Sequence, residues 1–200
     1  MGLSTPQIIQ QVLANRTRVT VADASLMPAA VMVLLYPKDG EYCVLLNKRS
    51  EQVEHHKGEI SFPGGARDPE DQDFLATALR EVEEEMGIHP AHISLLGQLD
   101  DVATRSHFGV RVFTGAIPYP YPFRPSADEI AEVLEVPISL LRSPAALRQE
   151  TRWVDGQGVS ACTYAYNHHL IFGATAKILQ QFLELLEEGT QRYAIGGNPR

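Results

Sequence analysis

Cysteine and long apolar segments are scarce in this sequence. Its 200 residues include two cysteines, Cys43 and Cys162, which do not form a CxxC pair, so we expect neither a disulfide scaffold nor a cysteine-ligated zinc site. We expect both thiols to be buried. The most apolar segment, residues 28–36, is about half as long as a membrane-spanning helix, and the N-terminus lacks the pattern of a secretory signal. The sequence therefore predicts a cytoplasmic protein without membrane contact.

Basic residues are also in the minority. Lys and Arg number 17 against 25 Asp and Glu, which gives a formal net charge of −8. Such a chain repels polyphosphate backbones, so nucleic-acid binding is not expected, and an anionic ligand has to be held by local cations or metal ions. The composition, 44% hydrophobic and 21% charged, is close to that of an average soluble protein, and the length fits one domain over residues 1–200.

Hydrophobic periodicity predicts a short helix and then a hairpin at the start of the chain. Apolar residues recur at helical spacing between positions 8 and 13. Two runs rich in β-forming residues, 29–36 and 42–46, flank Asp39 and Gly40, a pair typical of tight hairpin turns.

The rest of the chain predicts further strands and two longer helices. A strand is expected at 59–62, ended by Pro63, Gly64 and Gly65. An acidic loop, 66–73, then leads into a helix over 74–86, with Gly87 as its C-terminal cap. The later elements are strands at 93–99 and 110–117, a strand pair that includes Trp153 and residues 163–166 around a turn at 155–156, and a helix at 174–188. Residues 129–136 fit a helix or a strand. This order predicts an α/β/α sandwich with a mixed β-sheet.

The helix at 74–86 carries a concentration of negative charge. Its apolar residues recur at helical spacing and define the face expected to be buried; they are Leu75, Leu79, Val82 and Met86. Glu81, Glu84 and Glu85 remain as close neighbours on the surface of this helix, and their charges repel. Clustered carboxylate oxygens are natural ligands for Mg²⁺, and the preceding glycine pair lets a backbone carbonyl approach a ligand. The alternative is a solvated acidic face.

Residues 65–88 resemble the Nudix box, whose pattern is G-x5-E-x7-R-E-U-x-E-E-x-G-U with U aliphatic. Every fixed position from Arg80 to Ile88 matches. Counting from Gly65 places Asp71 at the first glutamate, whereas counting back from Arg80 places Gln72 there, so the loop is one residue longer and Asp71 is the expected replacement. The resemblance implies a Nudix-type sandwich with its core over about 29–187, and hydrolysis of a nucleoside diphosphate linked to another moiety.

The resemblance also implies roles for single residues. Glu81 and Glu85 would bind Mg²⁺ or Mn²⁺, with Glu84 as a further ligand or as the base. Gly65 would contribute its carbonyl oxygen, and Arg80 would orient a glutamate by a charge-assisted hydrogen bond. An additional acid is expected outside the box. Its candidates are Glu129, Glu132 and Glu135, with Glu132 preferred as the catalytic residue, and the alternative is a solvated acidic segment.

A second resemblance lies upstream of the box. Arg49, Ser50, Gly58 and the sequence FPGG stand at the spacing of a signature of the coenzyme A pyrophosphatase branch, roughly LLTxR[SA]x3Rx3Gx3FPGG. Asn47 replaces its threonine and Glu54 its second arginine. The resemblance implies hydrolysis of coenzyme A or acyl-CoA to adenosine 3′,5′-bisphosphate and the 4′-phosphopantetheine part. The expected substrate contacts are Arg49, Ser50, His56, Lys57, Gly58 and Gly64, with His55, His56 and Lys57 as sources of the missing positive charge.

Other interpretations of the function and of single residues stay open. Glu54 favours a diphosphatase for ADP-ribose or NADH. A noncatalytic Nudix-fold nucleotide sensor is supported by the replaced first glutamate and opposed by the intact glutamates of the box. Asp100 and Asp101 fit either a site at a strand end or an ordinary turn. Trp153 and Tyr166 are expected to serve packing rather than adenine stacking. A homodimer and a monomer are both compatible with the sequence.

Overall fold

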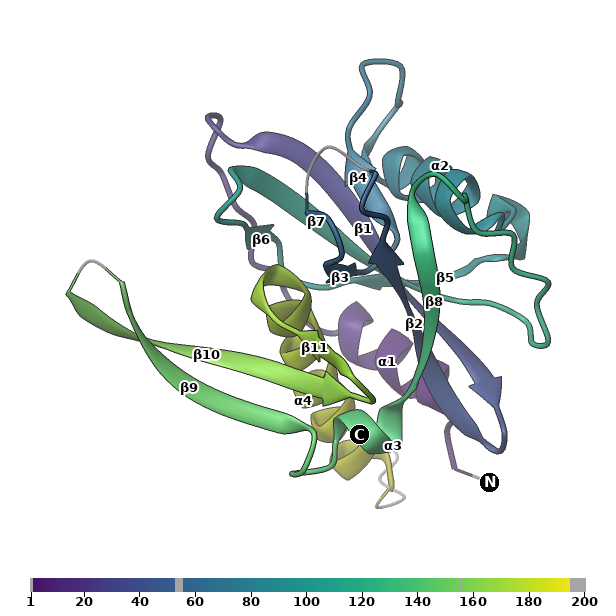
Figure 1. Cartoon of the computed structure of the whole chain (residues 1–200). Coiled ribbons are helices and arrows are strands. Elements are labelled where there is room, and N and C mark those ends of the chain that lie inside the picture. The colour runs from purple at the N-terminus through teal and green to yellow at the C-terminus, as the bar shows by residue number, and fades with distance from the viewer. Residues whose placement is uncertain (1, 53–55, 155, 195–200) are drawn as a thin grey trace.

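A mixed sheet with helices on both faces forms the centre of the computed structural model, which describes residues 2–52, 56–154 and 156–194. The sheet has eight strands. Helix α2 (Phe74–Met86) covers one face, and α1 (Thr5–Ala14) and α4 (Gly173–Ala194) cover the other (Figure 1). The predicted α/β/α sandwich with a mixed sheet is confirmed.

The predicted hairpin consists of β1 (Met27–Lys38) and β2 (Glu41–Arg49). Asp39 and Gly40 have φ angles of 51° and 86°, and positive φ at both turn residues matches the twist of the flanking strands. β1 also pairs in parallel with β7 (Phe108–Ala116), and β2 pairs antiparallel with β8 (Ile130–Pro137). Residues 129–136, which fitted either a helix or a strand in the sequence, therefore belong mostly to a strand of the large sheet.

Gly64 and Gly65, which were expected only to end the strand predicted at 59–62, form a strand of their own. The remaining strands of the sheet are β3 (Ile60–Ser61), β4 (Gly64–Ala66), β5 (Ser94–Gln98) and β6 (Val102–Ala103). β4 pairs antiparallel with the first half of β1, so the acidic loop starts later than expected. Because Gly64 has a φ of 152° and a Cβ there would lie 2.3 Å from the Ala30 carbonyl oxygen, only glycine fits this crossing.

The helix that bears the acidic residues has the predicted bounds. The Asp73 side chain accepts a hydrogen bond from the Ala76 N–H at its start, and Gly87 ends it with a left-handed φ of 66°. The predicted N-terminal helix is also present as α1. α4 extends beyond the predicted 174–188 at both ends. The short helices α3 (Ile138–Leu141) and η1 (Pro90–His92), a single 3₁₀ turn, complete the helical part. No helix among the described residues is long and apolar enough to cross a membrane.

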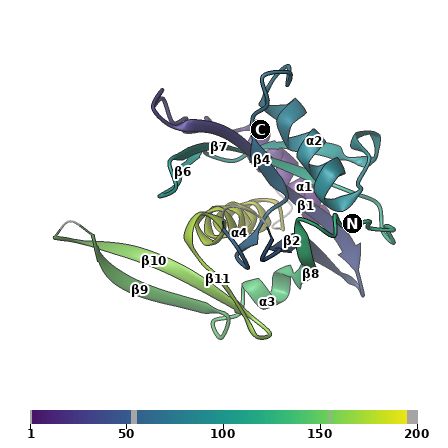
Figure 2. The same cartoon turned by 45° about the horizontal axis from the view of Figure 1, so that its top comes forward.

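A smaller sheet lies beside the sandwich. Its strands are β9 (Leu147–Val154), β10 (Gln157–Tyr166) and β11 (His169–Ile171), and the β9–β10 hairpin projects from the body of the molecule (Figures 1 and 2). The predicted strand pair is thus present, although Asp155 of its turn lies outside the described residues. Sequence patterns did not predict β11. Trp153 is 77% exposed on the projecting hairpin, so it packs against no core.

Two apolar cores flank the large sheet. One lies between the sheet and α1 and α4, and the other between the sheet and α2. On α2, Val82 and Met86 are fully buried, whereas Leu75 and Leu79 are only half-buried at the edge. Cys43 is buried as predicted. Cys162 is only half-buried, because it lies on β10 of the smaller sheet rather than on a strand of the large sheet.

Candidate active site

The acidic face of α2 meets the glycine pair of β4 and the end of β2. Glu85 is 1% exposed, so it lies on the buried side of the helix and not on a solvated acidic face. Its Oε2 accepts hydrogen bonds from the Gly64 N–H at 3.1 Å and from the Asn47 side-chain amide at 2.9 Å, and Arg49 Nη1 lies 3.2 Å from Oε1. Three elements far apart in the sequence thus converge on one carboxylate.

Burial makes the charge on Glu85 costly. It raises the pKa of this carboxyl to about 7, and the negative charges of Glu81 and Glu129 act in the same direction. The hydrogen bond from Gly64 and the positive charge of Arg49 act against the rise without cancelling it. The positive charge that the chain places around Glu85 therefore does not balance the cost of burying this carboxylate.

Asn47 holds Glu85 in place, a role that the sequence analysis did not assign. Asn47 is fully buried, and its Oδ1 accepts a hydrogen bond of 2.6 Å from the Ser61 hydroxyl. That bond directs the amide NH₂ group toward Glu85. Asn47 and Arg49 are two residues apart on β2 and so share a face of the sheet. The strand predicted from the sequence ended at residue 46; had it been extended to residue 49, this shared face would have been visible.

Glu81 faces the backbone of β4. A Cβ on Gly65 would lie 2.5 Å from Glu81 Oε1, so glycine allows the carboxylate to reach the main chain at this point. Burial raises the pKa of Glu81, Arg80 opposes the rise, and the charges of Glu84 and Glu129 add to it.

Arg80 organises the outer part of the cluster. Its Nε and Nη2 each lie 3.0 Å from an oxygen of Asp71, and its Nη1 lies 2.9 Å from both Glu81 and Glu84. These hydrogen bonds hold the pKa of Asp71 well below its usual range. Asp71 rather than the exposed Gln72 therefore occupies the position that faces Arg80. Glu84 remains 55% exposed in its side chain.

Among the acids outside α2, the structure brings Glu129 rather than Glu132 to the cluster. The charge of Glu129 acts on both Glu81 and Glu85, and the Ser50 N–H donates a 2.7 Å hydrogen bond to the Glu129 carbonyl oxygen. Glu132 lies on the opposite face of β8, the face that Leu134 and Val136 share with the α4 core, and it contacts His169. Glu135 is held by Lys38 and Tyr36. The preferred choice of Glu132 therefore does not fit the geometry.

The residues expected to contact substrate lie at the end of β2, in the loop that follows it and at the start of β4. Arg49 has a buried Nε with no hydrogen-bond partner among the described residues. Ser50 is buried, and its hydroxyl accepts a bond from the Gln52 N–H at 3.1 Å. Gly58, with a φ of 66°, donates its N–H to the Arg49 carbonyl oxygen.

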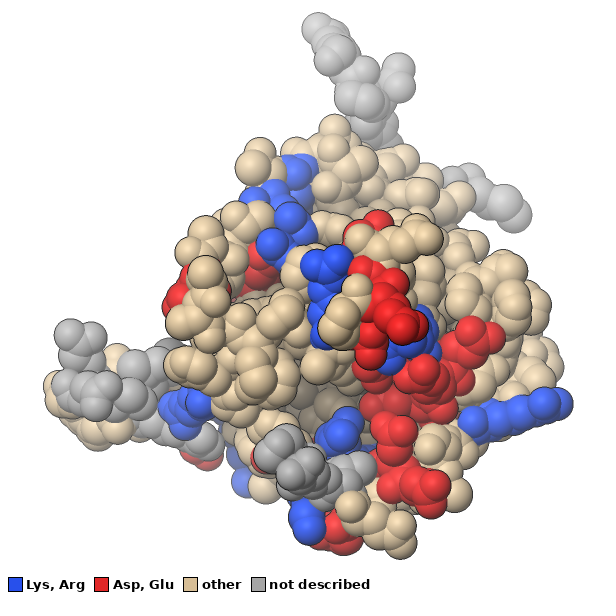
Figure 3. All heavy atoms as spheres, turned by 90° about the horizontal axis from the view of Figure 1, so that it is seen from above, with Lys and Arg blue, Asp and Glu red and all other residues tan. Residues whose placement is uncertain are grey.

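The two candidate cations of the same loop lie at its surface. His56 and Lys57 are exposed, and His56 Nδ1 lies 2.9 Å from a Glu59 carboxylate oxygen. Glu54 and His55 lie outside the described residues. On the space-filling view, acidic side chains form a band beside a hollow in the surface (Figure 3).

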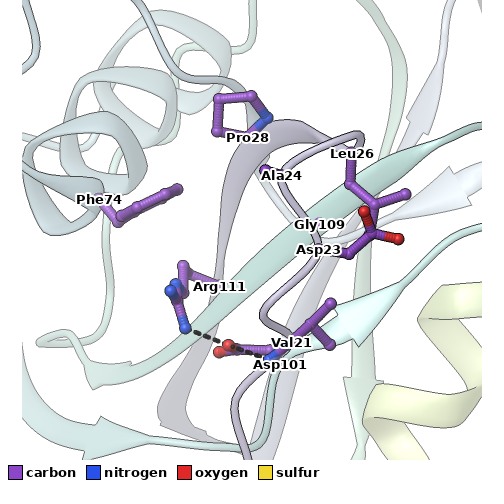
Figure 4. A pocket seen from close by; sticks show the side chains of 9 residues that line it. All are labelled: Val21, Asp23, Ala24, Leu26, Pro28, Phe74, Asp101, Gly109 and Arg111. Atoms are coloured by element: carbon purple, nitrogen blue, oxygen red, sulfur yellow. Dashed lines mark hydrogen bonds and ion pairs between the residues drawn. The ribbon is translucent and has the colours of Figure 1, made fainter.

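Asp100 and Asp101 serve other contacts. Asp100 pairs with Arg16 at 2.6 Å, and Asp101 pairs with Arg111. Arg111, Asp101 and Phe74 line a cavity of about 280 Å³ near the start of α2 (Figure 4). None of the glutamates of α2 lines this cavity, so it is separate from the acidic cluster.

The cluster has the donor set of a divalent-cation site. The carboxylate of Glu81 lies beside the backbone of Gly65, and that of Glu85 accepts a hydrogen bond from the Gly64 N–H. Glu84 contacts the same guanidinium as Glu81. Oxygen ligands of this kind suit Mg²⁺ and Mn²⁺ rather than softer ions. The uncompensated burial of Glu85 is a second observation that fits such an ion.

Comparison with known proteins gives consistent matches. The family model for the NUDIX domain matches residues 26–154. The chain is 34% identical over 144 residues to a protein of Photorhabdus laumondii named uncharacterized Nudix hydrolase NudL, covering 72% of this chain and 77% of the relative. It is 31% identical over 158 residues to the protein of the same name from Yersinia pestis, covering 78% of each. A MutT/nudix family protein from Enterococcus faecalis has a similar structure, with a TM-score of 0.53 and 18% identity, covering 84% of this chain and 64% of the other.

Proposed function

Because the chain belongs to the Nudix hydrolase family, we propose that it hydrolyses the diphosphate bond of coenzyme A or acyl-CoA with the help of Mg²⁺ or Mn²⁺. The products would be adenosine 3′,5′-bisphosphate and the (acyl-)4′-phosphopantetheine part. Glu81, Glu85 and the Gly65 carbonyl oxygen are the proposed metal ligands, with Glu84 as a further ligand or as the base.

The observation that carries this proposal is the buried, negatively charged contact between α2 and β4. Glu85 is buried beside Glu81, and the pKa of both carboxyls is raised by burial. A divalent ion bound here would neutralise the diphosphate and lower the pKa of the attacking water. The hydrogen bonds from Asn47 and Gly64 fix the orientation of Glu85 before substrate arrives.

The chain also offers residues for proton transfer and for phosphate binding. Glu84 is exposed and held by Arg80, which suits a group that exchanges protons with water. Glu129 is a second acid close to the cluster. Arg49 presents an unpaired buried donor, and an anionic phosphate oxygen would satisfy it.

The coenzyme A assignment rests on the loop after β2. Arg49, Ser50, Gly58 and Gly64 stand at the spacing of the coenzyme A pyrophosphatase signature, and they extend from the end of β2 to the start of β4. Coenzyme A carries a phosphate on its ribose in addition to the diphosphate, so its binding requires more positive charge than ADP-ribose. His56 and Lys57, exposed in this loop, are the proposed source of that charge.

A substrate panel tests the proposal. Purified protein is incubated with Mg²⁺ and with coenzyme A, acetyl-coenzyme A, ADP-ribose or NADH, and the products are separated by chromatography. We expect turnover of the coenzyme A species, with the highest kcat/KM of the panel. Preferred turnover of ADP-ribose or NADH would replace the substrate assignment, and binding without turnover of any of the four would indicate a nucleotide sensor.

A further inference from the structure

Two histidines converge at the turn between β10 and β11, outside the proposed active site. Tyr166 and His169 are partners in the ladder, so only Asn167 and His168 form the loop. Adjacent side chains of a regular strand point to opposite faces of the sheet. Here Asn167 has a left-handed φ of 52°, and the turn brings the rings of His168 and His169 to within 3.9 Å of each other, measured between centroids.

Glu132 of β8 faces these two rings. Its carboxylate lies 3.2 Å from His169 Nε2, and one ligand atom from each of the three residues lies within 4.8 Å of the others. Tetrahedral Zn²⁺ has bonds of about 2.0–2.1 Å, which places its ligand atoms about 3.4 Å apart. The His169–Glu132 pair already has this spacing, and rotation of the exposed His168 ring would bring in the third ligand.

The burial of the three side chains suits an ion that enters from solvent. The side chain of His169 is 5% exposed, whereas that of Glu132 is 42% exposed and His168 lies at the surface. The inner ligand is therefore fixed by packing, and the outer two leave a path to the site.

We propose that Glu132, His168 and His169 bind Zn²⁺, with water as the fourth ligand, and that this ion joins the small sheet to β8 of the large sheet. The ligand set differs in chemistry from the acidic cluster on α2. Imidazole nitrogens favour Zn²⁺ and similar transition ions, whereas a site of oxygen ligands alone favours Mg²⁺ or Mn²⁺. The two sites can therefore be distinguished by the ion that each one prefers.

Zinc titration of the full chain tests this site. Tag-free protein is stripped of metal, and its zinc affinity is measured by competition with a chromogenic chelator in excess Mg²⁺, which occupies the oxygen site. We expect one Zn²⁺ per chain, and we expect His168→Ala and Glu132→Gln each to weaken binding at least about 10-fold. Because His168 is exposed, its variant should fold normally, which circular dichroism checks.

A pair of surface histidines elsewhere in the chain provides the matched control. His89 and His92 are both exposed, their ring centroids lie 5.5 Å apart, and His92 contacts the Tyr121 hydroxyl rather than a carboxylate. We expect His92→Ala to leave the zinc affinity unchanged. The proposal is overturned if the wild-type chain binds no Zn²⁺ in excess Mg²⁺, if His168→Ala binds it as tightly as wild type, or if His92→Ala weakens binding as much as His168→Ala does.

Discussion

At Glu85, stability and the proposed activity impose opposite requirements. A carboxylate that is 1% exposed is unfavourable for folding unless positive charge surrounds it, and only Arg49 forms an ion pair with it among the described residues. The same unsatisfied charge is what a divalent ion requires from its ligand. Two predictions at this residue separate the two effects.

The first concerns activity. We expect Glu85→Gln to lower kcat/KM for coenzyme A by at least about 100-fold, because it removes the charge of one proposed metal ligand while keeping the size of the side chain. Glu83→Gln is the matched control, since Glu83 is an exposed glutamate of the same helix. Steady-state kinetics in Mg²⁺ provide the measurement. Near-normal activity of the Glu85 variant would refute the metal-site assignment.

The second prediction concerns the pH dependence of the stability of the fold. The pKa of Glu85 is about 7 in the folded chain against an ordinary value of 4.5, so between these values the native state keeps a proton that the unfolded state releases. The contribution of Glu85 to stability is therefore present below about pH 4.5 and lost as the pH rises through about 7, a loss on the order of 3 kcal/mol. Denaturant unfolding in EDTA at pH 5 and pH 8 measures it.

Comparison with a variant isolates this contribution. The unfolding free energy of wild type minus that of Glu85→Gln should fall between pH 5 and pH 8, because glutamine does not titrate. Saturating Mg²⁺ should reduce that fall, since the ion stabilises the ionised carboxylate. A difference that does not change with pH would mean that Glu85 is ionised throughout the folded range.

At the level of elements, the close crossing of β4 and α2 positions the proposed metal ligands. A methyl group on Gly65 would lie 2.5 Å from Glu81 Oε1 and would displace that carboxylate. We expect Gly65→Ala to lower kcat at least about 10-fold while the chain stays folded. Gly109→Ala on β7 is the control, since its Cβ would meet Leu26 at 3.4 Å, an ordinary contact. Equal activity of the two variants would show that the approach of Gly65 to Glu81 is not required.

β8 shows how an element decides which acid is near the site. The strand pairs with β2, and a bulge interrupts this ladder between Lys48 and Arg49. Glu132 follows the alternation of the strand onto the α4 face, whereas Glu129 precedes the strand and is tied to Ser50. Spacing along the sequence could not choose between these residues, because the choice depends on the register with another strand.

At the level of the whole molecule, the two cores carry the fold, and the projecting hairpin is an addition to it. Phe182 of α4 is fully buried in the core shared with α1, whereas Trp153 on β9 is 77% exposed. We expect Phe182→Ala to lower the unfolding free energy by about 3–5 kcal/mol and Trp153→Ser to change it by less than about 0.5 kcal/mol. Chemical denaturation measures both. Similar losses in the two variants would mean that the hairpin is part of the folding unit's core.

The sequence by itself determined the features that depend on near neighbours along the chain. The helix over 74–86, its Gly87 cap and the Asp39–Gly40 hairpin follow from periodicity and turn chemistry, and the arrangement of glutamates in the box predicted the Nudix family. These signals act over a few residues, so folding of the rest of the chain does not alter them.

Only the tertiary structure decided which residues meet. It buried Glu85 beneath Asn47 and Arg49, selected Asp71 over Gln72 as the partner of Arg80, and brought Glu129 rather than Glu132 to the cluster. It also left Cys162 half-buried on a strand outside the sandwich. Each of these outcomes depends on contacts between segments distant in sequence, and strand register and packing fix such contacts only when the whole chain folds.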